Sequence, residues 1–403
     1  MQRRDFIRLA GGLGAAAALS PMLAACATPA AAGGGGSTDG PIKLGFLSAL
    51  TGLETILGAT QYQCFELAVN QINAAGGIAG REITTIKEDN AADSKQTIDK
   101  SNKLALSDKV TAVVGLITSI EREAALTVLP KNKVPLLYTT YYEGSYFDAH
   151  ACDPYYVGLG QVPNQQIDPL VPWLSDNVGS SYYIVGSDYI WPRGTSIRLA
   201  ELVEDSGGKI VGEQYFPFGT TDFSQVIRDI DSSGADIAWV PLAGTDFLTF
   251  LNQYHQFDGK AKLVSIGMDD VFAHENPAAA EGVIASQAYF MSLENDANAK
   301  FLKAYANDYG ADAPVNAIGV AAYNAPWLIK AAIEEVDGST DPDKWMPAIS
   351  KVSLDGPMGV VSVDPTNQNT TQANYIGEVA SDGSIPVIEA VQNVTPDVPG
   401  CSL

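Results

Sequence analysis

Short apolar runs alternate with amphipathic stretches along most of this chain. Runs rich in β-branched residues predict strands, and apolar positions three or four residues apart predict helices. The first series is strand 42–47, helix 59–75, strand 82–88, helix 94–106, strand 110–115, helix 119–131 and strand 134–138. Gly76 and Gly77 end the first helix, because glycine readily adopts the left-handed conformation found at helix C-termini.

A second series begins after Pro163. It comprises helix 165–177, strand 181–186, helix 193–206, strand 209–216, helix 222–233, strand 237–242 and helix 246–256. Buried strands separated by helices of this length indicate βαβ units and parallel sheets. The two series therefore predict an α/β fold of two Rossmann-like lobes, each built on a parallel sheet.

The rest of the chain is predicted to return to both lobes. Helices 297–309 and 316–335 are assigned to the first lobe, and the strand-like stretch 359–391 is assigned to the second. Three crossings, near 158–163, 288–293 and 354–356, would form a three-strand hinge. The predicted boundaries are 41–160 and 291–354 for the first lobe, 161–290 and 355–395 for the second, and 396–403 for a C-terminal tail.

The N-terminus has the pattern of an export signal. Arg3 and Arg4 precede a weakly apolar stretch rich in Ala and Gly, which is too short to span a bilayer. The stretch ends in Leu-Ala-Ala-Cys26, which resembles a bacterial lipobox, and the paired arginines resemble a twin-arginine signal. We expect a signal peptide over 1–25, lipidation of Cys26 and a flexible tether over 26–40.

The net charge and the cysteine content restrict the partners and the kinds of site that the chain can have. The 403-residue chain carries a formal net charge of −23, and such an acidic body repels nucleic acid and anionic lipid. Three widely spaced histidines and no Cys-x-x-Cys argue against a metal site. Cys64 is expected to be a buried thiol. Cys152 and Cys401 can pair in an oxidising compartment, a question that the sequence leaves open.

Catalytic motifs are absent from the sequence. It contains no G-x-S-x-G, P-loop or H-E-x-x-H motif, and no G-x-G-x-x-G that opens a helix after a strand. The adjacent Asp269 and Asp270 could form an acid/base couple, but in so acidic a chain a solvated pair is the preferred interpretation. We therefore expect neither an enzyme nor a cofactor.

Hydroxyl and aromatic side chains follow three of the predicted strands, in segments 115–119, 138–144 and 185–193. The C-terminal ends of parallel strands are where open α/β sheets bind ligands. Ser119 is expected to cap the helix that follows it, which is compatible with ligand contact. Tyr189 and Trp191 are large apolar rings close together in a loop, which favours a pocket wall.

Several stretches resemble one known family. They are AVNQINAAGGIAGREI (68–83), YYEG (141–144), VPNQQ (162–166), VGSDYIWPRG (185–194), GGKIVGEQYFPFGTTDFSQVI (207–227) and DGPMGVVSVDPTNQ (355–368). With them the chain resembles type I periplasmic substrate-binding proteins of the leucine/isoleucine/valine-binding branch. Within that branch it is most similar to the urea-binding and short-chain-amide-binding proteins of ABC transporters.

The resemblance implies a site and a function. The family's ligand contacts fall on Thr118, Ser119, Tyr138, Thr140, Tyr189 and Trp191. They imply a lipid-anchored, extracytoplasmic and monomeric protein that closes two lobes over urea or a short amide and delivers it to the membrane subunits of an ABC permease. Three departures leave the ligand open: residues 118–122 read Thr-Ser-Ile-Glu-Arg where urea and amide binders commonly have a TSASR-like stretch, Ile117 stands where the family has an aromatic residue, and residues 244–247 read Gly-Thr-Asp-Phe.

Other interpretations of the function remain open. In an amino-acid binder of the same transporter family, the ligand carboxylate would sit at Ser119 and its ammonium would pair with Asp246 or Asp269. A ligand sensor that signals to a partner protein would use the same site, although the export signal favours transport. An exported hydrolase would require a nucleophile–base pair that the sequence does not show.

Replacing Cys26 by Ser should release the protein from the membrane. Cys26 is the predicted acceptor of the lipid, and stable anchoring depends on its acyl chains. Fractionation of cells that express the variant should find it in the soluble fraction. Persistence of Cys26→Ser in the membrane fraction would show that something other than this residue holds the protein there.

Overall fold

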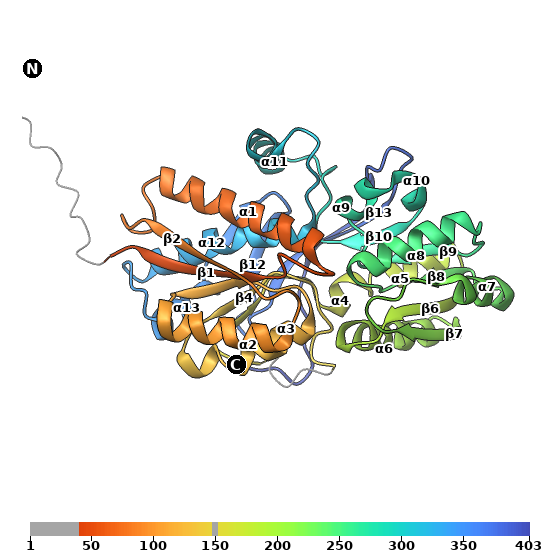
Figure 1. The fold of residues 1–403 in the computed structure, drawn as a ribbon, viewed down its shortest axis with the longest axis horizontal. Coiled ribbons are helices and arrows are strands. Elements are labelled where there is room, and N and C mark those ends of the chain that lie inside the picture. The colour runs from red at the N-terminus through yellow and green to blue at the C-terminus, as the bar shows by residue number, and fades with distance from the viewer. Residues whose placement is uncertain (1–39, 147–151) are drawn as a thin grey trace, which may run out of the picture. The chain divides into compact units, whose positions relative to one another are not determined.

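The computed structural model describes residues 40–146 and 152–403. The predicted signal peptide, Cys26 and the tether up to residue 39 lie outside the described residues. Figure 1 shows the two lobes, the first coloured mainly red to orange and blue, and the second yellow-green to cyan.

The first lobe is built on a parallel sheet of five strands. Their order is β2 (Ile83–Asp89), β1 (Ile42–Ser48), β3 (Ala112–Gly115), β4 (Leu136–Tyr138) and β5 (Tyr156–Gly158). All four neighbouring pairs run parallel. β3, β4 and β5 are fully buried, as expected for strands that are covered on both faces, whereas the edge strand β2 has exposed Thr84 and Lys87.

Helices cover both faces of this sheet (Figure 1). The helical elements are α1 (Thr55–Ala74), α2 (Ser94–Asn102), η1 (Lys103–Asp108), α3 (Ser119–Leu126), η2 (Pro130–Asn132), α11 (Asp296–Tyr309), α12 (Ala317–Glu335) and α13 (Pro342–Ile349). Leu44 and Phe46 of β1 pack with α1 and α12 in one core. Val113 and Leu136 pack on the opposite face with apolar residues of η1 and α3. The late helices α11 and α12 thus pack against the start of the chain.

The second lobe contains a larger, mixed sheet. Its order is β11 (Ser353–Gly356), β12 (Gly359–Val363), β13 (Thr370–Glu378), β10 (Ile284–Gln287), β9 (Lys262–Ser265), β8 (Ile237–Trp239), β6 (Ser181–Ser187) and β7 (Lys209–Phe216), and β14 (Val387–Val394) pairs with β13. The strands from β10 to β7 run parallel. The C-terminal strands join antiparallel.

The helices of the second lobe are α4 (Pro163–Gln166), α5 (Leu170–Asn177), α6 (Ile190–Asp205), α7 (Ser224–Ser233), α8 (Gly244–Gln256), α9 (Asp270–Glu275) and α10 (Pro277–Ala280). One large core unites this lobe, with Trp239 and Phe250 among its fully buried residues. It also takes in Leu57, Ile117 and Tyr141 from the first lobe, so apolar surfaces of the two lobes meet.

The chain passes from the first sheet to the second after β5, returns to the helices of the first lobe after β10, and enters the second sheet again at β11. Hydrogen bonds join the passage after β5 to the start of β13. The Gly158 N–H donates to the Gln368 carbonyl over 3.0 Å, and the Gln161 side chain donates to Asn374 Oδ1 over 3.0 Å. Cross-linked passages of this kind allow the lobes to rotate without separating.

The end of the chain packs back on the first lobe. Val398 is buried beside Tyr138 and Tyr156, and Cys401 forms a disulfide with Cys152. The pairing that the sequence left open is therefore present in the structure. Cys64 is a buried free thiol, as expected.

The element boundaries differ from the predictions where turns fall inside apolar patterns. The first helix begins at Thr55 rather than at residue 59, and Pro169 separates α4 from α5 where one helix was predicted. The strand predicted over 237–242 is longer than β8, and the helix predicted over 119–131 is longer than α3. The short strands β5, β9 and β10 and the helices α9 and α13 had no counterpart in the sequence interpretation.

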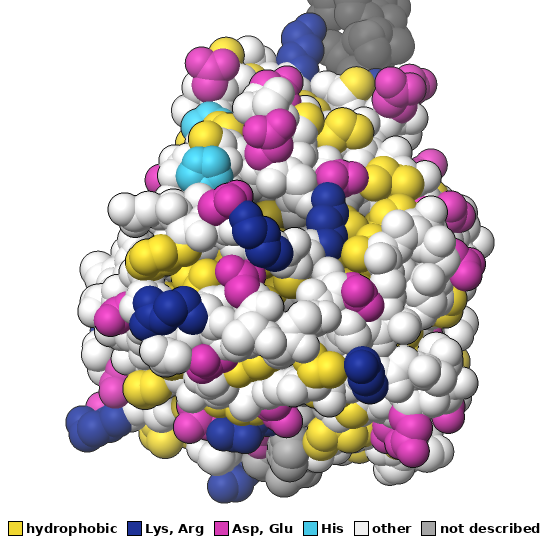
Figure 2. Space-filling model, turned by 90° about the vertical axis from the view of Figure 1, so that its right-hand side faces the viewer, with side chains coloured by type: hydrophobic (Ala, Val, Ile, Leu, Met, Phe, Trp, Pro, Cys, Tyr) yellow, Lys and Arg dark blue, Asp and Glu magenta, His cyan; other side chains and the backbone are white. Residues whose placement is uncertain are grey.

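The outer end of the second lobe carries acidic side chains with basic ones between them (Figure 2). Among the residues that the structure describes, no helix combines the length and the apolar character needed to cross a bilayer.

Loss of the disulfide should lower the free energy of unfolding by about 2–4 kcal/mol, because the bridge closes a loop with a sequence separation of 249 residues. Urea unfolding of Cys401→Ser should show this loss, and the exposed Ser402→Ala should behave as wild type. A reductant should destabilise the wild type and leave Cys401→Ser unchanged. Equal stability of Cys401→Ser and wild type would contradict the assignment.

Candidate functional site

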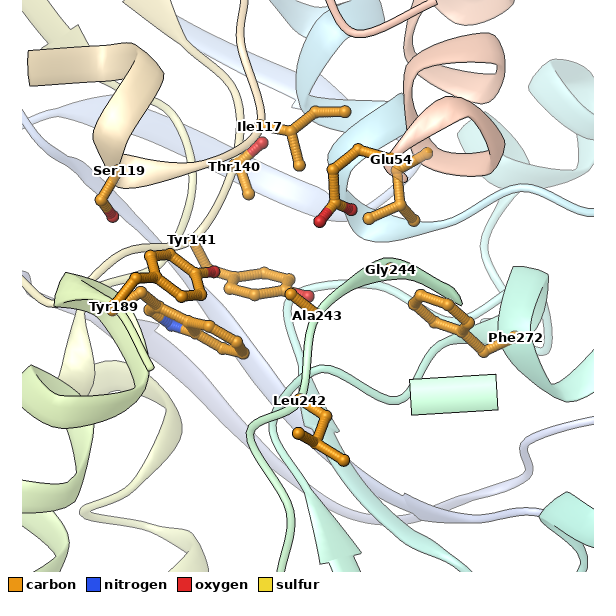
Figure 3. Close-up of a pocket in the computed structure, with 12 residues that line it drawn as sticks. Glu54, Ile117, Ser119, Thr140, Tyr141, Tyr189, Leu242, Ala243, Gly244 and Phe272 are labelled. Carbon is orange, nitrogen blue, oxygen red and sulfur yellow. The ribbon is translucent and has the colours of Figure 1, made fainter. Parts of the chain in front are cut away.

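A pocket with an empty volume of about 350 Å³ lies between the lobes. It is lined by Glu54, Leu57, Ile117, Ser119, Thr140, Tyr141, Tyr189, Trp191, Leu242, Ala243, Gly244 and Phe272 (Figure 3). The first six follow β1, β3 and β4, and the others follow β6, β8 and β9. The pocket therefore forms where the C-terminal ends of parallel strands from both sheets meet.

Four of the predicted contact residues line this pocket: Ser119, Thr140, Tyr189 and Trp191. Thr118 and Tyr138 do not. Thr118, and not Ser119 as predicted, caps α3, in a capping box with Glu121. The Tyr138 hydroxyl donates to the Ile117 carbonyl over 2.6 Å and lies behind the pocket wall. Both residues shape the loops that carry Ser119 and Thr140.

Asp246 and Asp269, the predicted partners of a ligand ammonium, also lie outside the pocket lining. Asp246 accepts the Gly219 N–H over 2.9 Å. Asp269 caps α9 through the Val271 and Phe272 N–H groups. Both carboxylates are thus occupied by structural hydrogen bonds.

Asp269 also connects the lobes. Its Oδ2 accepts from the Asn316 side chain over 2.8 Å, and Asn316 itself caps α12 of the first lobe. The prediction that Asp269 and Asp270 form a solvated pair is wrong, because both side chains are buried. Burial raises the pKa of Asp269 to about 6 and that of Asp270 to about 8.

The two pocket hydroxyl groups donate hydrogen bonds to groups outside the pocket. Ser119 donates to Glu143 Oε2 over 2.5 Å, and Thr140 donates to the Leu116 carbonyl over 2.9 Å. A hydroxyl has one proton and two lone pairs. Ser119 Oγ also accepts from Arg122 Nη1 over 3.5 Å, so Ser119 keeps one lone pair and Thr140 keeps two, and neither has a proton left for a ligand.

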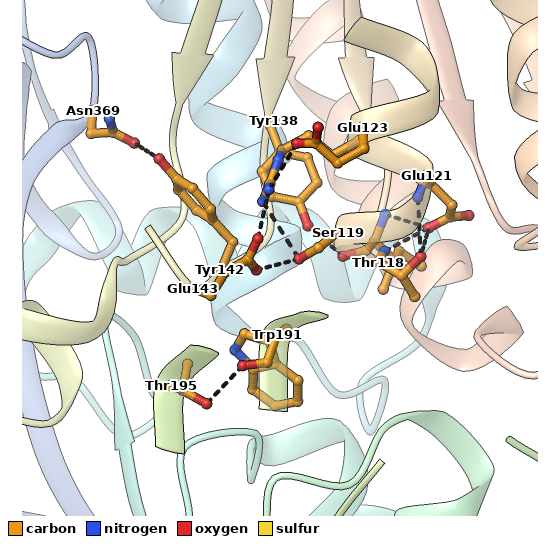
Figure 4. A network of polar contacts seen from close by, with 12 residues as sticks. Thr118, Ser119, Glu121, Glu123, Tyr138, Tyr142, Glu143, Trp191, Thr195 and Asn369 are labelled. Carbon is orange, nitrogen blue, oxygen red and sulfur yellow. Dashed lines mark hydrogen bonds and ion pairs between the residues drawn. The ribbon is translucent and has the colours of Figure 1, made fainter. Parts of the chain in front are cut away.

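A buried ion pair fixes Ser119 (Figure 4). Arg122 donates to Glu143 Oε1 over 2.7 Å, and both side chains are fully buried. The guanidinium also lies over the Tyr142 ring, 4.3 Å from its centroid. The positive charge of Arg122 is therefore compensated before any ligand binds.

Glu54 is the functional candidate that sequence reasoning missed. It immediately precedes α1, yet its side chain makes no cap hydrogen bond. The residue is 1 % exposed, and neither carboxyl oxygen has a hydrogen-bond partner among the described residues. Figure 3 shows the carboxyl group pointing into the pocket. The available signal was a glutamate at the end of the loop after the first strand, and the late helix start predicted there obscured it.

Desolvation dominates the electrostatics of Glu54. Burial raises its pKa to about 8, and the nearby Glu121 and Asp246 carboxylates add to the shift. A buried carboxyl group that lacks a partner is costly, so Glu54 favours either protonation or a donor supplied by a ligand.

Aromatic rings form the opposite wall. The Trp191 ring lies 5.3 Å from Tyr141 and 6.2 Å from Tyr189, between centroids. Burial raises the pKa of both tyrosines well above the usual value, so their hydroxyls stay protonated. The Trp191 Nε1–H is buried and has no partner among the described residues.

Gly244 permits the lobes to approach each other. Its φ is +53°, and a Cβ there would lie 2.7 Å from the Leu53 carbonyl and 3.0 Å from Glu54 Cδ. Gly244 belongs to the second lobe, whereas Leu53 and Glu54 belong to the first. A larger residue would therefore oppose the contact between the lobes beside Glu54.

This geometry agrees with the comparisons. Residues 41–384 match the family model described as periplasmic binding protein. The chain belongs to this family. It is 26 % identical over 373 residues to a Leu/Ile/Val-binding protein homolog 7 of Brucella abortus, with 86 % of this chain and 91 % of the relative covered.

Solved structures show the same fold. A solute binding protein of an ABC transporter from Rhodopseudomonas palustris HaA2, in complex with p-hydroxybenzoic acid, has a TM-score of 0.79, 25 % identity and coverage of 88 % and 97 %. The branched-chain amino acid transporter substrate binding protein LivJ from Streptococcus pneumoniae, in complex with isoleucine, has a TM-score of 0.78, 23 % identity and coverage of 87 % and 99 %. These relatives support the leucine/isoleucine/valine branch but not the predicted closeness to urea and amide binders.

While the two lobes are in contact, as in this structure, the free energy of unfolding should fall as the pH rises from about 5 to 8. The raised pKa values of Glu54, Asp269 and Asp270 give stability that is complete below their ordinary values and is lost as the pH passes the folded values. In Glu54→Gln the fall in the free energy of unfolding between pH 5 and 8 should be smaller by several kcal/mol, which is the order of magnitude set by the Glu54 pKa shift.

Urea unfolding at pH 5, 6.5 and 8 measures the profile, with the exposed Glu204→Gln as a matched control that should follow the wild type. Identical profiles for Glu54→Gln and wild type would show that the Glu54 carboxyl group titrates as it does in the unfolded chain.

Proposed function

We propose that this chain is the substrate-binding component of an ABC uptake transporter. It is anchored outside the cytoplasmic membrane by lipid on Cys26, acts as a monomer and delivers a small ligand to the permease subunits. Membership in the periplasmic binding protein family and the ABC-transporter neighbours support this function. The observation that carries it is a buried pocket lined from both lobes, which a hinged pair of lobes can open and close.

The lining favours a ligand that is rich in hydrogen-bond donors and is not an anion. Glu54, Ser119 and Thr140 offer acceptors, and none of the twelve lining residues is Lys or Arg. Arg122 lies nearby but is paired with Glu143. An aromatic acid such as the one bound by the Rhodopseudomonas protein would bring a second carboxylate close to Glu54 without a free cation to balance it. Short amides and amines match the acceptors.

A branched-chain amino acid is the second candidate. The Brucella relative and the isoleucine-bound neighbour favour it, as do the aliphatic side chains of Leu57, Ile117 and Leu242 in the lining. Its carboxylate would require N–H donors at the start of α3. Glu121 accepts the Ile117 and Thr118 N–H groups just before α3, which leaves the Ser119 and Ile120 N–H groups as the donors for that carboxylate.

Ligand binding should close the lobes and reduce the radius of gyration. A thermal-shift panel of short amides, amines, amino acids and small acids identifies the ligand, since a compound at about 100 times its dissociation constant adds roughly 2.7 kcal/mol of stability. Small-angle scattering should then show a smaller radius for the wild type and for the exposed-site variant Thr245→Ala.

Gly244→Ala should bind the same compound more weakly and stay at the larger radius, because its Cβ would collide with the opposite lobe. A radius that does not change when the wild type is saturated would contradict closure of the lobes.

A further inference from the structure

Within residues 40–146 and 152–403, the Glu54 carboxyl group of the pocket has no hydrogen-bond partner. The lining contains no other acid, and both Glu54 oxygens are buried and free of hydrogen bonds among the described residues. Its neighbour across the lobe boundary is the backbone at Gly244, which supplies close packing and no charge. A carboxylate in this setting acquires its partner only from the contents of the pocket.

The other acceptors of the pocket add to this carboxylate. Ser119 and Thr140 line the same pocket and keep lone pairs there, since their protons go to Glu143 and to the Leu116 carbonyl and only one Ser119 lone pair is taken, by Arg122. A primary ammonium group carries three N–H donors and one positive charge. The pocket thus offers a counter-charge and two neutral acceptors, which matches the number of ammonium donors.

The aromatic wall suits a cation as well. Tyr141, Tyr189 and Trp191 present large ring surfaces to the pocket, and a desolvated cation is attracted to aromatic faces. The remaining lining, including Leu57, Leu242 and Phe272, is apolar. Such a lining suits a short alkyl or aryl group.

We propose that the pocket binds the primary ammonium group of a small amine that lacks a carboxylate, with Glu54 as the counter-charge. This inference rests on the proposed function and names the ligand class of the same site. The absence of a carboxylate on the ligand follows from the charges: Arg122 is paired with Glu143, and none of the twelve lining residues is Lys or Arg. An amino acid would leave its own carboxylate without a positive partner.

Among the described residues, the two charged groups that raise the Glu54 pKa are both acids. Glu121 on α3 and Asp246 on α8 both disfavour its ionisation. Tyr141 and Tyr189 also face it and remain neutral. A bound cation reverses this effect, so ligand binding is coupled to loss of the Glu54 proton. Below the Glu54 pKa of about 8, affinity for an alkylammonium should rise roughly tenfold for each pH unit.

Two matched ligand series test the inference by calorimetry on the full chain in detergent. The first is isobutylamine, isobutyramide and isobutyrate, and the second is benzylamine, benzamide and benzoate; within each series the head group is cationic, neutral or anionic. We expect the amine to bind most tightly and the carboxylate least, with the affinity of the amine rising from pH 6 to 8. Leucine, which adds a carboxylate to a branched-chain amine, should bind more weakly than isobutylamine.

Glu54→Gln should weaken amine binding at least tenfold and change amide binding less than threefold. Glu204→Gln, an exposed control, should match the wild type. Glu54→Leu serves as a second variant, with folding of each checked by circular dichroism. Unchanged amine affinity in the folded Glu54 variants, or tighter binding of a carboxylate or of leucine by the wild type, would overturn the inference.

The outcomes also separate this inference from the proposed function. Binding of an amide, a carboxylate or leucine that Gly244→Ala weakens, together with failure of both amines, removes the amine assignment and leaves a substrate-binding protein. Failure of every compound in both series, and of leucine, to bind contradicts the amine assignment and counts against the proposed function as well.

Discussion

The pocket depends on one buried carboxyl group at the boundary of two lobes. Glu54 reaches the boundary because α1 begins immediately after it, and Gly244 of the opposite lobe approaches so closely that a Cβ would not fit. The contact removes the carboxyl group from water without giving it a hydrogen bond. Closing the lobes therefore costs free energy, because the Glu54 carboxyl group loses water and gains no hydrogen bond. A ligand that donates a hydrogen bond removes this cost, so ligand binding is coupled to closure.

The hydrogen bonds around the pocket determine which ligands can remove this free-energy cost. The pair formed by Arg122 and Glu143 is fully buried, and it fixes the direction of the Ser119 proton. Thr140 is fixed in the same way by a backbone carbonyl. The Ser119 and Thr140 protons are engaged within the protein, so these two hydroxyl groups act only as acceptors towards a ligand, whereas the Trp191 Nε1–H remains a donor. A ligand that donates hydrogen bonds therefore finds three acceptors in the lining, at Glu54, Ser119 and Thr140.

The sequence predicted the architecture better than the site. Alternating apolar runs and helical patterns are local signals, so the two α/β lobes and the positions of Ser119, Thr140, Tyr189 and Trp191 at strand ends could be recognised. Burial of charge depends on tertiary contacts. Asp269 looked solvated but caps α9 and bonds Asn316 of the other lobe, and Glu54 was lost when the helix after β1 was predicted to start late. Whether a carboxylate has a partner cannot be seen until distant segments are brought together.

The most direct test is a crystal structure of the protein with the amine that binds most tightly. The account predicts closed lobes, with the ligand nitrogen within hydrogen-bond distance of the Glu54 carboxylate and of at least one of Ser119 and Thr140, and with its apolar group against Tyr141 and Trp191. A ligand nitrogen away from Glu54, or a carboxylate ligand held at the start of α3 with Glu54 still unpartnered, would contradict it.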